Sequence, residues 1–232
     1  MSCETAMMIN NIPALLIGPD SSDLFLFVHG QYGCKEEARA FAKLTKAKVL
    51  AIDLPCHGER AMEKGSLDPM HAVPELEGIM VWARQRYDRI GLRANSIGAY
   101  FSLLAFKRQS LFASLLVSPV VNMVGMIESM MKAQGVDEED LRREKRIQAS
   151  TGPALDWEYL QYALAHPLDS CQSPSFILYG GQDSMVRRLD VESFARRLGC
   201  RLTVEESCEH WFHTPQQLRA LDSWTLECLA SI

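Results

Sequence analysis

Short runs of apolar residues alternate along the chain with segments whose apolar residues recur at helical spacing. The short runs are typical of buried strands, and the periodic segments of helices that cover a sheet. This alternation predicts an α/β protein with a mostly parallel central sheet and helices on both faces. The expected strands are Leu24–His29, Lys48–Leu54, Arg89–Ala94, Leu111–Val117, Phe176–Gly180 and Arg201–Glu205, after a hairpin of Ala6–Ile9 and Ile12–Ile17; the expected helices are Lys35–Leu44, Pro74–Tyr87, Ile97–Phe106, Val191–Leu198 and Pro215–Leu229.

The segment 121–174 interrupts the alternation, with helical patterns and no clear strand. It is interpreted as a helical lid. Residues 1–120 and 175–232 then form one core domain, into which this lid is inserted. Met123, Met126 and Met130 fall near one face of its first expected helix. Either they seat the lid on the core domain or, since Met packs against groups of varied shape, they contact the acyl part of a substrate.

Composition narrows the class of protein. The chain has 232 residues, of which 47% are hydrophobic and 23% charged, as in an ordinary globular domain. A net charge of −5 provides no broad cationic surface for a phosphate backbone, so nucleic acid is not expected as a partner.

The N-terminus and the cysteines indicate the compartment. No Lys or Arg precedes Lys35, and no apolar run is long enough to span a bilayer, so neither a signal peptide nor a membrane span is expected. The seven cysteines are odd in number and never spaced C-x-x-C, which disfavours a disulfide framework and a zinc ribbon. A cytoplasmic location is expected, and no metal site.

Ser96 falls between an apolar strand and a helix, in Ala94-Asn95-Ser96-Ile97-Gly98. A sharp turn from strand to helix holds such a residue in a strained conformation with its side chain exposed, and it needs small residues two positions away on either side. Ala94 and Gly98 satisfy that need. Ser96 is therefore a candidate nucleophile, and the alternative is an ordinary serine that caps a helix.

Two further polar residues follow strands of the same predicted sheet. Asp183 comes after the Phe176 strand, in Tyr179-Gly180-Gly181-Gln182-Asp183, and His210 after the last strand. Ser96, Asp183 and His210 thus have the order nucleophile, acid, histidine that a hydrolytic triad requires. His213 is a competing candidate for the base, with a role in capping the last helix as its alternative.

A tetrahedral intermediate also needs donors for its oxyanion. The backbone N–H of Ile97 would point toward the attack site of Ser96. The second candidate is the N–H of Gln31, in the glycine-containing turn after the Leu24 strand, where the alternative is an ordinary turn.

Together these segments resemble the α/β-hydrolase-fold serine hydrolases. The matching pieces are His29-Gly30-Gln31, the segment 53–60, the turn at Ser96, the segment 179–183 and Glu209-His210-Trp211-Phe212. The resemblance covers almost the whole chain in the family's order. It departs at Ala94, where the family usually has Gly, and at Cys56, where Gly is common in the family's Asp-x-Pro-Gly-His-Gly pattern.

The resemblance implies an esterase-like enzyme with no cofactor that acts on a small-molecule ester. Ser96 would be the nucleophile, His210 the base, Asp183 the acid, and Gln31 and Ile97 the oxyanion donors. A thioesterase or an aminopeptidase with the same triad, and a non-catalytic binding protein of this fold, remain as alternatives. The oligomeric state and the physiological substrate are not fixed by the sequence.

Overall fold

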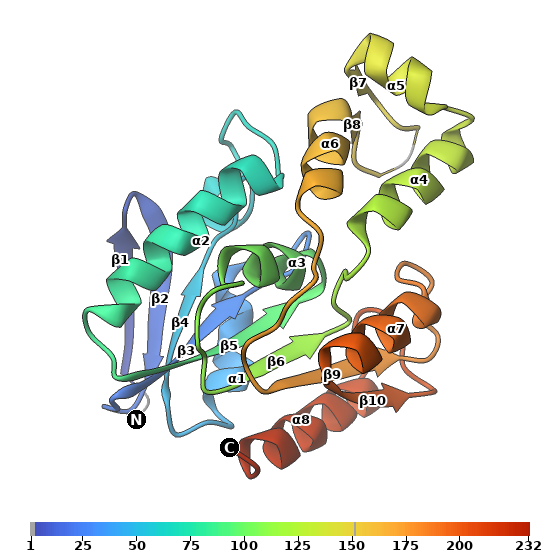
Figure 1. Ribbon diagram of the computed structural model, residues 1–232. Helices are drawn as coiled ribbons and strands as arrows, with labels where there is room; N and C mark the ends of the chain where they lie inside the picture. Colours follow the sequence, from blue (N-terminus) through green and yellow to red (C-terminus); the bar gives the residue numbers. More distant parts are fainter. Residues whose placement is uncertain (1–2, 151) are drawn as a thin grey trace.

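The computed structural model describes residues 3–150 and 152–232, which fold around one large mixed sheet (Figure 1). Its strand order is β1-β2-β4-β3-β5-β6-β9-β10. The strands from β4 to β10 are parallel to one another, whereas β1 and β2 form an antiparallel edge. The bounds are β1 Cys3–Ile9, β2 Ile12–Gly18, β3 Asp23–Val28, β4 Lys48–Ile52, β5 Arg89–Asn95, β6 Ser114–Val117, β9 Ser175–Gly180 and β10 Arg201–Glu205. The predicted α/β class with a mostly parallel sheet is confirmed.

Continuous apolar runs form the central strands because both faces of the sheet are covered. In β3, Leu24, Leu26 and Val28 belong to one buried cluster, and Phe25 and Phe27 belong to the other. All five side chains are almost fully buried. The sheet therefore has a hydrophobic core on each side.

Helices cover the two faces unequally. Apolar residues of α2, α3 and α7 contribute to the larger core, and those of α1 and α8 to the smaller one. The bounds are α1 Ala38–Ala42, α2 Pro69–Arg84, α3 Ser96–Ala105, α7 Arg188–Leu198 and α8 Pro215–Leu229, with 3-10 turns η1 at Lys35–Glu37 and η2 at Gly58–Arg60.

Helix α2 begins five residues before the predicted start at Pro74. The Asp68 side chain accepts a hydrogen bond from the His71 N–H, and Pro69 occupies the first turn, where a missing N–H costs nothing. Pro74 lies inside the helix instead. Sequence reasoning took the wrong proline as the start.

We call the segment between β6 and β9 the inserted segment; its described part rises beyond the ends of β5 and β6 at the upper right of Figure 1. It contains the helices α4 (Met123–Gln134), α5 (Glu138–Glu144) and α6 (Trp157–Ala165). Side chains of Asn122, Asp137 and Asp156 cap the three N-termini. The expectation of no strand here is wrong, because β7 (Arg146–Ile147) and β8 (Leu155–Asp156) pair as a short ribbon.

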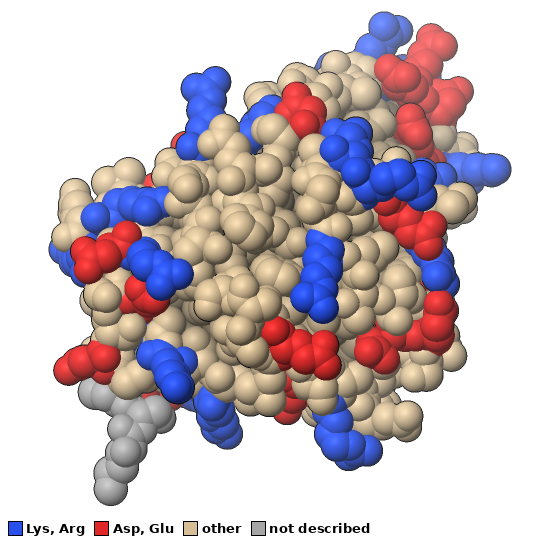
Figure 2. Space-filling view, turned by 60° about the horizontal axis from the view of Figure 1, so that its bottom comes forward, with Lys and Arg blue, Asp and Glu red and all other residues tan. Residues whose placement is uncertain are grey.

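The surface carries both signs of charge. On the face in Figure 2, Lys and Arg side chains alternate with Asp and Glu, and neither sign forms a continuous field. No helix in the described ranges 3–150 and 152–232 is long and apolar enough to cross a membrane.

Candidate active site

The turn from β5 into α3 brings Ser96 out of the sheet in a strained conformation. Ser96 has a φ of +49°, a region that residues with a side chain rarely adopt. A Cβ on Gly98 would lie 2.1 Å from the carbonyl oxygen of His29, so only glycine fits there. The neighbouring loop thus packs directly against this turn, and the serine is half-buried at the edge of the sheet.

His210 connects Ser96 to Asp183. Its Nε2 lies 2.8 Å from Ser96 Oγ, and its Nδ1 lies 2.7 Å from Asp183 Oδ2. The other carboxylate oxygen of Asp183 accepts the backbone N–H groups of Met185 and Val186, at 2.8 and 2.9 Å. Because the side chains of His210 and Asp183 are 3% and 0% exposed, water hardly competes for these hydrogen bonds. The three residues predicted from the sequence are brought together in one chain of hydrogen bonds.

Ser118, which sequence reasoning missed, fastens the loop that carries His210. It follows β6 with a φ of +45°, and its Oγ donates to the carbonyl oxygen of His210 over 3.0 Å. Two residues later, the Val120 N–H donates to the carbonyl oxygen of Ser96 over 3.2 Å. The end of β6 therefore sets the spacing between the serine and the histidine. A serine directly after an apolar strand was the available signal.

The loop 29–33, which contains Gln31, is fixed by two histidines. His29 Nε2 accepts the Leu54 N–H at 3.0 Å, and His57 Nε2 accepts the Tyr32 N–H at 2.9 Å. Burial lowers the pKa of His29 to about 4, so its ring is neutral at pH 7 and can accept this hydrogen bond. His29 therefore holds this loop against Leu54.

A buried ion pair between Lys35 and Asp53 fixes the chain directly after this loop. Asp53 accepts the backbone N–H and the ammonium group of Lys35, at 2.9 and 2.7 Å, and the N–H of Glu59 at 3.0 Å. Although burial alone lowers the pKa of Lys35, its hydrogen bonds with Asp53 and Glu59 raise it overall. A Cβ on Gly58 would overlap the Asp53 carboxylate, so glycine is required there. These contacts explain the resemblance in segment 53–60.

A sequence model described as the alpha/beta hydrolase family matches residues 25–221, which is most of the chain. The chain belongs to the alpha/beta hydrolase family. The match includes Ser96, His210 and Asp183.

Solved structures share the fold of this alpha/beta hydrolase at low sequence identity. Est1E from Butyrivibrio proteoclasticus with bound ferulic acid is 17% identical, with 98% of each chain covered and a TM-score of 0.79. Alpha/beta hydrolase domain-containing protein 10 from mouse is 12% identical over 99% of this chain and 98% of that one, with a TM-score of 0.75. An esterase from Pyrococcus furiosus is 16% identical over 100% and 91%, with a TM-score of 0.69. No curated protein matches the sequence significantly.

Two cavities of this hydrolase share Gln31, in the loop that packs beside Ser96. The first, of about 350 Å³, lies under the inserted segment and is lined by Gln31, Ile97, Met123, Met126 and Met130. We call it the roofed cavity. All three methionines predicted from the sequence line it, together with Ile97, the residue that follows Ser96.

The second cavity, of about 240 Å³, is lined by Ser96 itself and by His210, Arg93, Glu37 and Trp211 among others. We call it the histidine-side cavity. Gln31 lines both cavities, which places the loop 29–33 at their junction. Arg93 was not singled out in the sequence, although an arginine inside an apolar strand was a usable signal.

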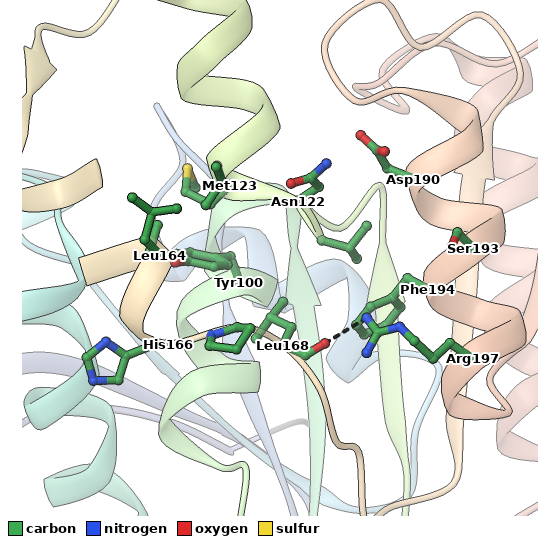
Figure 3. Close-up of a pocket in the computed structure, with 14 residues that line it drawn as sticks. Tyr100, Asn122, Met123, Leu164, His166, Leu168, Asp190, Ser193, Phe194 and Arg197 are labelled. Carbon is green, nitrogen blue, oxygen red and sulfur yellow. Dashed lines mark hydrogen bonds between the residues drawn. The ribbon is translucent and has the colours of Figure 1, made fainter. Parts of the chain in front are cut away.

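A third cavity, of about 380 Å³, lies where the inserted segment joins the core, and contains none of Ser96, Asp183 or His210 (Figure 3). The Arg197 Nη2 donates across it to the carbonyl oxygen of Leu168 over 2.8 Å. This contact ties the returning chain to α7. The third cavity therefore lies at the junction between the inserted segment and α7, away from Ser96.

His213, the competing histidine, lies outside the hydrogen-bonded chain. Its side chain is exposed, and its Nδ1 lies 2.7 Å from the Trp211 carbonyl oxygen. The cap of α8 is Thr214, which forms a capping box with Gln217. His213 takes part only through its backbone N–H, which donates to the Gln217 side chain.

Proposed function

We propose that this alpha/beta hydrolase cleaves carboxylic esters of small molecules through an acyl-enzyme on Ser96. The observation that carries the proposal is the pair of hydrogen bonds on His210, 2.8 Å to Ser96 Oγ and 2.7 Å to Asp183 Oδ2. One ring nitrogen can accept the serine proton while the other donates to a buried carboxylate. That is the arrangement that activates a serine for acyl transfer.

In the acylation step, Ser96 Oγ attacks the ester carbonyl carbon as its proton moves to His210 Nε2. The oxyanion that forms is stabilised by the backbone N–H groups of Gln31 and Ile97. Ile97 lies in the first turn of α3, where backbone N–H groups have no acceptor within the helix. The backbone N–H of Gln31 has no acceptor among the described residues, 3–150 and 152–232. Both groups are thus free to donate to a substrate.

Collapse of this intermediate breaks the bond to the alcohol oxygen, which takes the proton from His210 Nε2. A water molecule then gives a proton to His210 and attacks the acyl carbon, and the carboxylic acid leaves as the proton returns to Ser96. Asp183 fixes the ring orientation and stabilises its cation throughout. No step requires a cofactor or a metal.

We assign the two parts of the ester to the two cavities. The leaving alcohol must lie within reach of His210, which lines the histidine-side cavity but not the roofed one. The acyl group then occupies the roofed cavity, against Met123, Met126 and Met130. In this proposal the segment 121–174 acts as a lid on a core made of residues 1–120 and 175–232.

Substitution of Ser96 tests the proposal. Ser96→Ala should lower kcat for p-nitrophenyl butanoate by about 10⁴–10⁶, because the nucleophile is gone, with an unchanged melting temperature. Ser110→Ala, at an exposed serine, serves as the matched control and should keep full activity. A Ser96 variant that retains a tenth of the rate would refute the assignment.

A further inference from the structure

Arg93 is a buried cation beside Ser96 whose donors are largely unused. It lies in β5, three residues before Ser96, lines the histidine-side cavity and is 4% exposed. Its Nη1 donates to the Ala94 carbonyl and the Asn95 side chain. Its Nε is fully enclosed without a partner, and no hydrogen bond from Nη2 is recorded in the described part of the chain.

A buried guanidinium without an anionic partner is energetically costly. Burial lowers the pKa of Arg93 to about 10, so the group remains a cation at neutral pH. The rings of Phe27 and Phe41 lie 5.9 and 6.0 Å from its central carbon and provide only weak cation–π contact. Among the described residues, no carboxylate forms an ion pair with it within 4.0 Å. Such a group calls for a partner that the chain does not supply.

We propose that the histidine-side cavity binds a leaving group that carries a carboxylate, and that the Arg93 guanidinium recognises it. The planar fork of arginine matches a carboxylate, and hydrogen bonds between opposite charges are the strong ones. The inference rests on the proposed esterase, since it is His210 that makes this the leaving-group side. The substrate class is therefore an ester of a small hydroxy acid.

The size of the cavity fits such an alcohol. A cavity of about 150 Å³ is known to hold benzene, and this one has about 240 Å³. Trp211 and Phe212 line it beside the polar groups. A hydroxybenzoate or a shorter aliphatic hydroxy acid can be accommodated.

Glu37 opposes the binding of an anion from the same cavity. The charge of its carboxylate acts to raise the pKa of Arg93, although the two side chains form no ion pair. Burial raises the pKa of Glu37 itself. Glu37 would thus repel the carboxylate of the substrate and weaken its binding to the guanidinium. Glu37→Gln should strengthen the preference for a charged leaving group a few-fold.

Two pairs of butanoyl esters test the proposal directly. The esters of 3-hydroxybenzoate and of glycolate are each compared with the neutral carboxamide of the same alcohol. The hydrogen bond between the substrate carboxylate and Arg93, weakened by the repulsion from Glu37, should raise kcat/KM for the carboxylate member by about tenfold in at least one pair. Equal rates in both pairs, or faster amides, would overturn the proposal.

Two variants locate the effect. Arg93→Gln should reduce the preference to within about twofold while the amide esters are still cleaved. Arg89→Gln, at an exposed arginine that begins the same strand and pairs with Asp23, should retain the full preference. A preference that survives in folded Arg93→Gln would also overturn the assignment.

A binding measurement separates this proposal from the esterase and does not depend on the Arg93 variant. Calorimetry on the intact Ser96→Ala protein should show 3-hydroxybenzoate or glycolate binding about tenfold more tightly than its carboxamide. If neither ester pair is cleaved but this binding difference is present, the esterase fails and the anion site stands. If esters are cleaved and neither acid binds more tightly, the anion site fails alone.

Discussion

The loops at the edge of the sheet and the inserted segment are held in place by different forces. Around Ser96, buried polar groups form specific hydrogen bonds, such as those of His29 with Leu54 and of Ser118 with His210. In the inserted segment, α4 and α6 pack through apolar side chains such as Ile127 and Leu160. Directional contacts fix atoms to a fraction of an ångström, whereas apolar contacts tolerate exchange of similar side chains. Substitutions at the loops should therefore abolish activity, and those in the segment should adjust specificity.

The largest effect is expected at His210 in the last loop, and only a small one at the neighbouring His213. His210→Ala should lose activity about as completely as Ser96→Ala, by roughly 10⁴ or more in kcat, and the double variant should be no worse. His213→Ala should keep most of its activity, because its side chain is exposed and outside the hydrogen-bonded chain. Ester hydrolysis by the four proteins measures this, and an inactive His213 variant would reverse the assignment.

The second effect concerns acid stability through His29. The neutral ring has a folded pKa of about 4, below the ordinary value of 6.5, so the unfolded chain takes up a proton first as the pH falls. The contribution of His29 to the free energy of unfolding is complete above pH 6.5 and should fall by about 3 kcal/mol by pH 4.

Urea unfolding of wild type and His29→Gln at several pH values measures this contribution. The wild type should lose its advantage over the variant as the pH falls through this window. A difference between the two proteins that stays constant from pH 7 to pH 4 would contradict the role of a neutral, buried His29.

The smallest effect is expected in the inserted segment. Each CH₂ buried in the roofed cavity contributes about 0.8 kcal/mol, so kcat/KM should rise a few-fold per carbon from acetyl to about hexanoyl esters. Met126→Ser and Met130→Ser should flatten this rise. Met62→Ser, at a methionine that is 94% exposed, is the control. Chain-length profiles parallel to wild type, with only the melting temperature lowered, would leave the methionines as structural contacts.

The sequence predicted the sheet and the main site residues because strand order determines which loops share an edge. Ser96, Asp183 and His210 each follow a strand, and parallel strands end at the same edge, so their proximity followed from the pattern. The boundaries of helices and strands were harder to predict. Helix α2 begins at Pro69 because of one capping bond from Asp68, and β7 and β8 are two-residue strands that exist only as a pair. Such details depend on partners distant from the local pattern.

The supporting residues of the site were not predictable in the same way. Ser118 directly follows an apolar strand and Arg93 lies inside one, but their roles depend on where the fold places them, one against the His210 carbonyl and the other in a cavity wall. Met126 and Met130 were identified as candidates from helical spacing alone. Which cavity they line depends on how the inserted segment packs, and spacing within one helix does not determine that.

The most direct test of the hydrogen-bonded serine is its reaction with an alkyl fluorophosphonate, followed by mass spectrometry of the peptides. Activation by His210 should make Ser96 the labelled residue, with one adduct per chain and loss of esterase activity in proportion to labelling. His210→Ala should label far more slowly. Absence of an adduct, or an adduct on another serine, would contradict the proposal that Ser96, His210 and Asp183 form a hydrolytic triad.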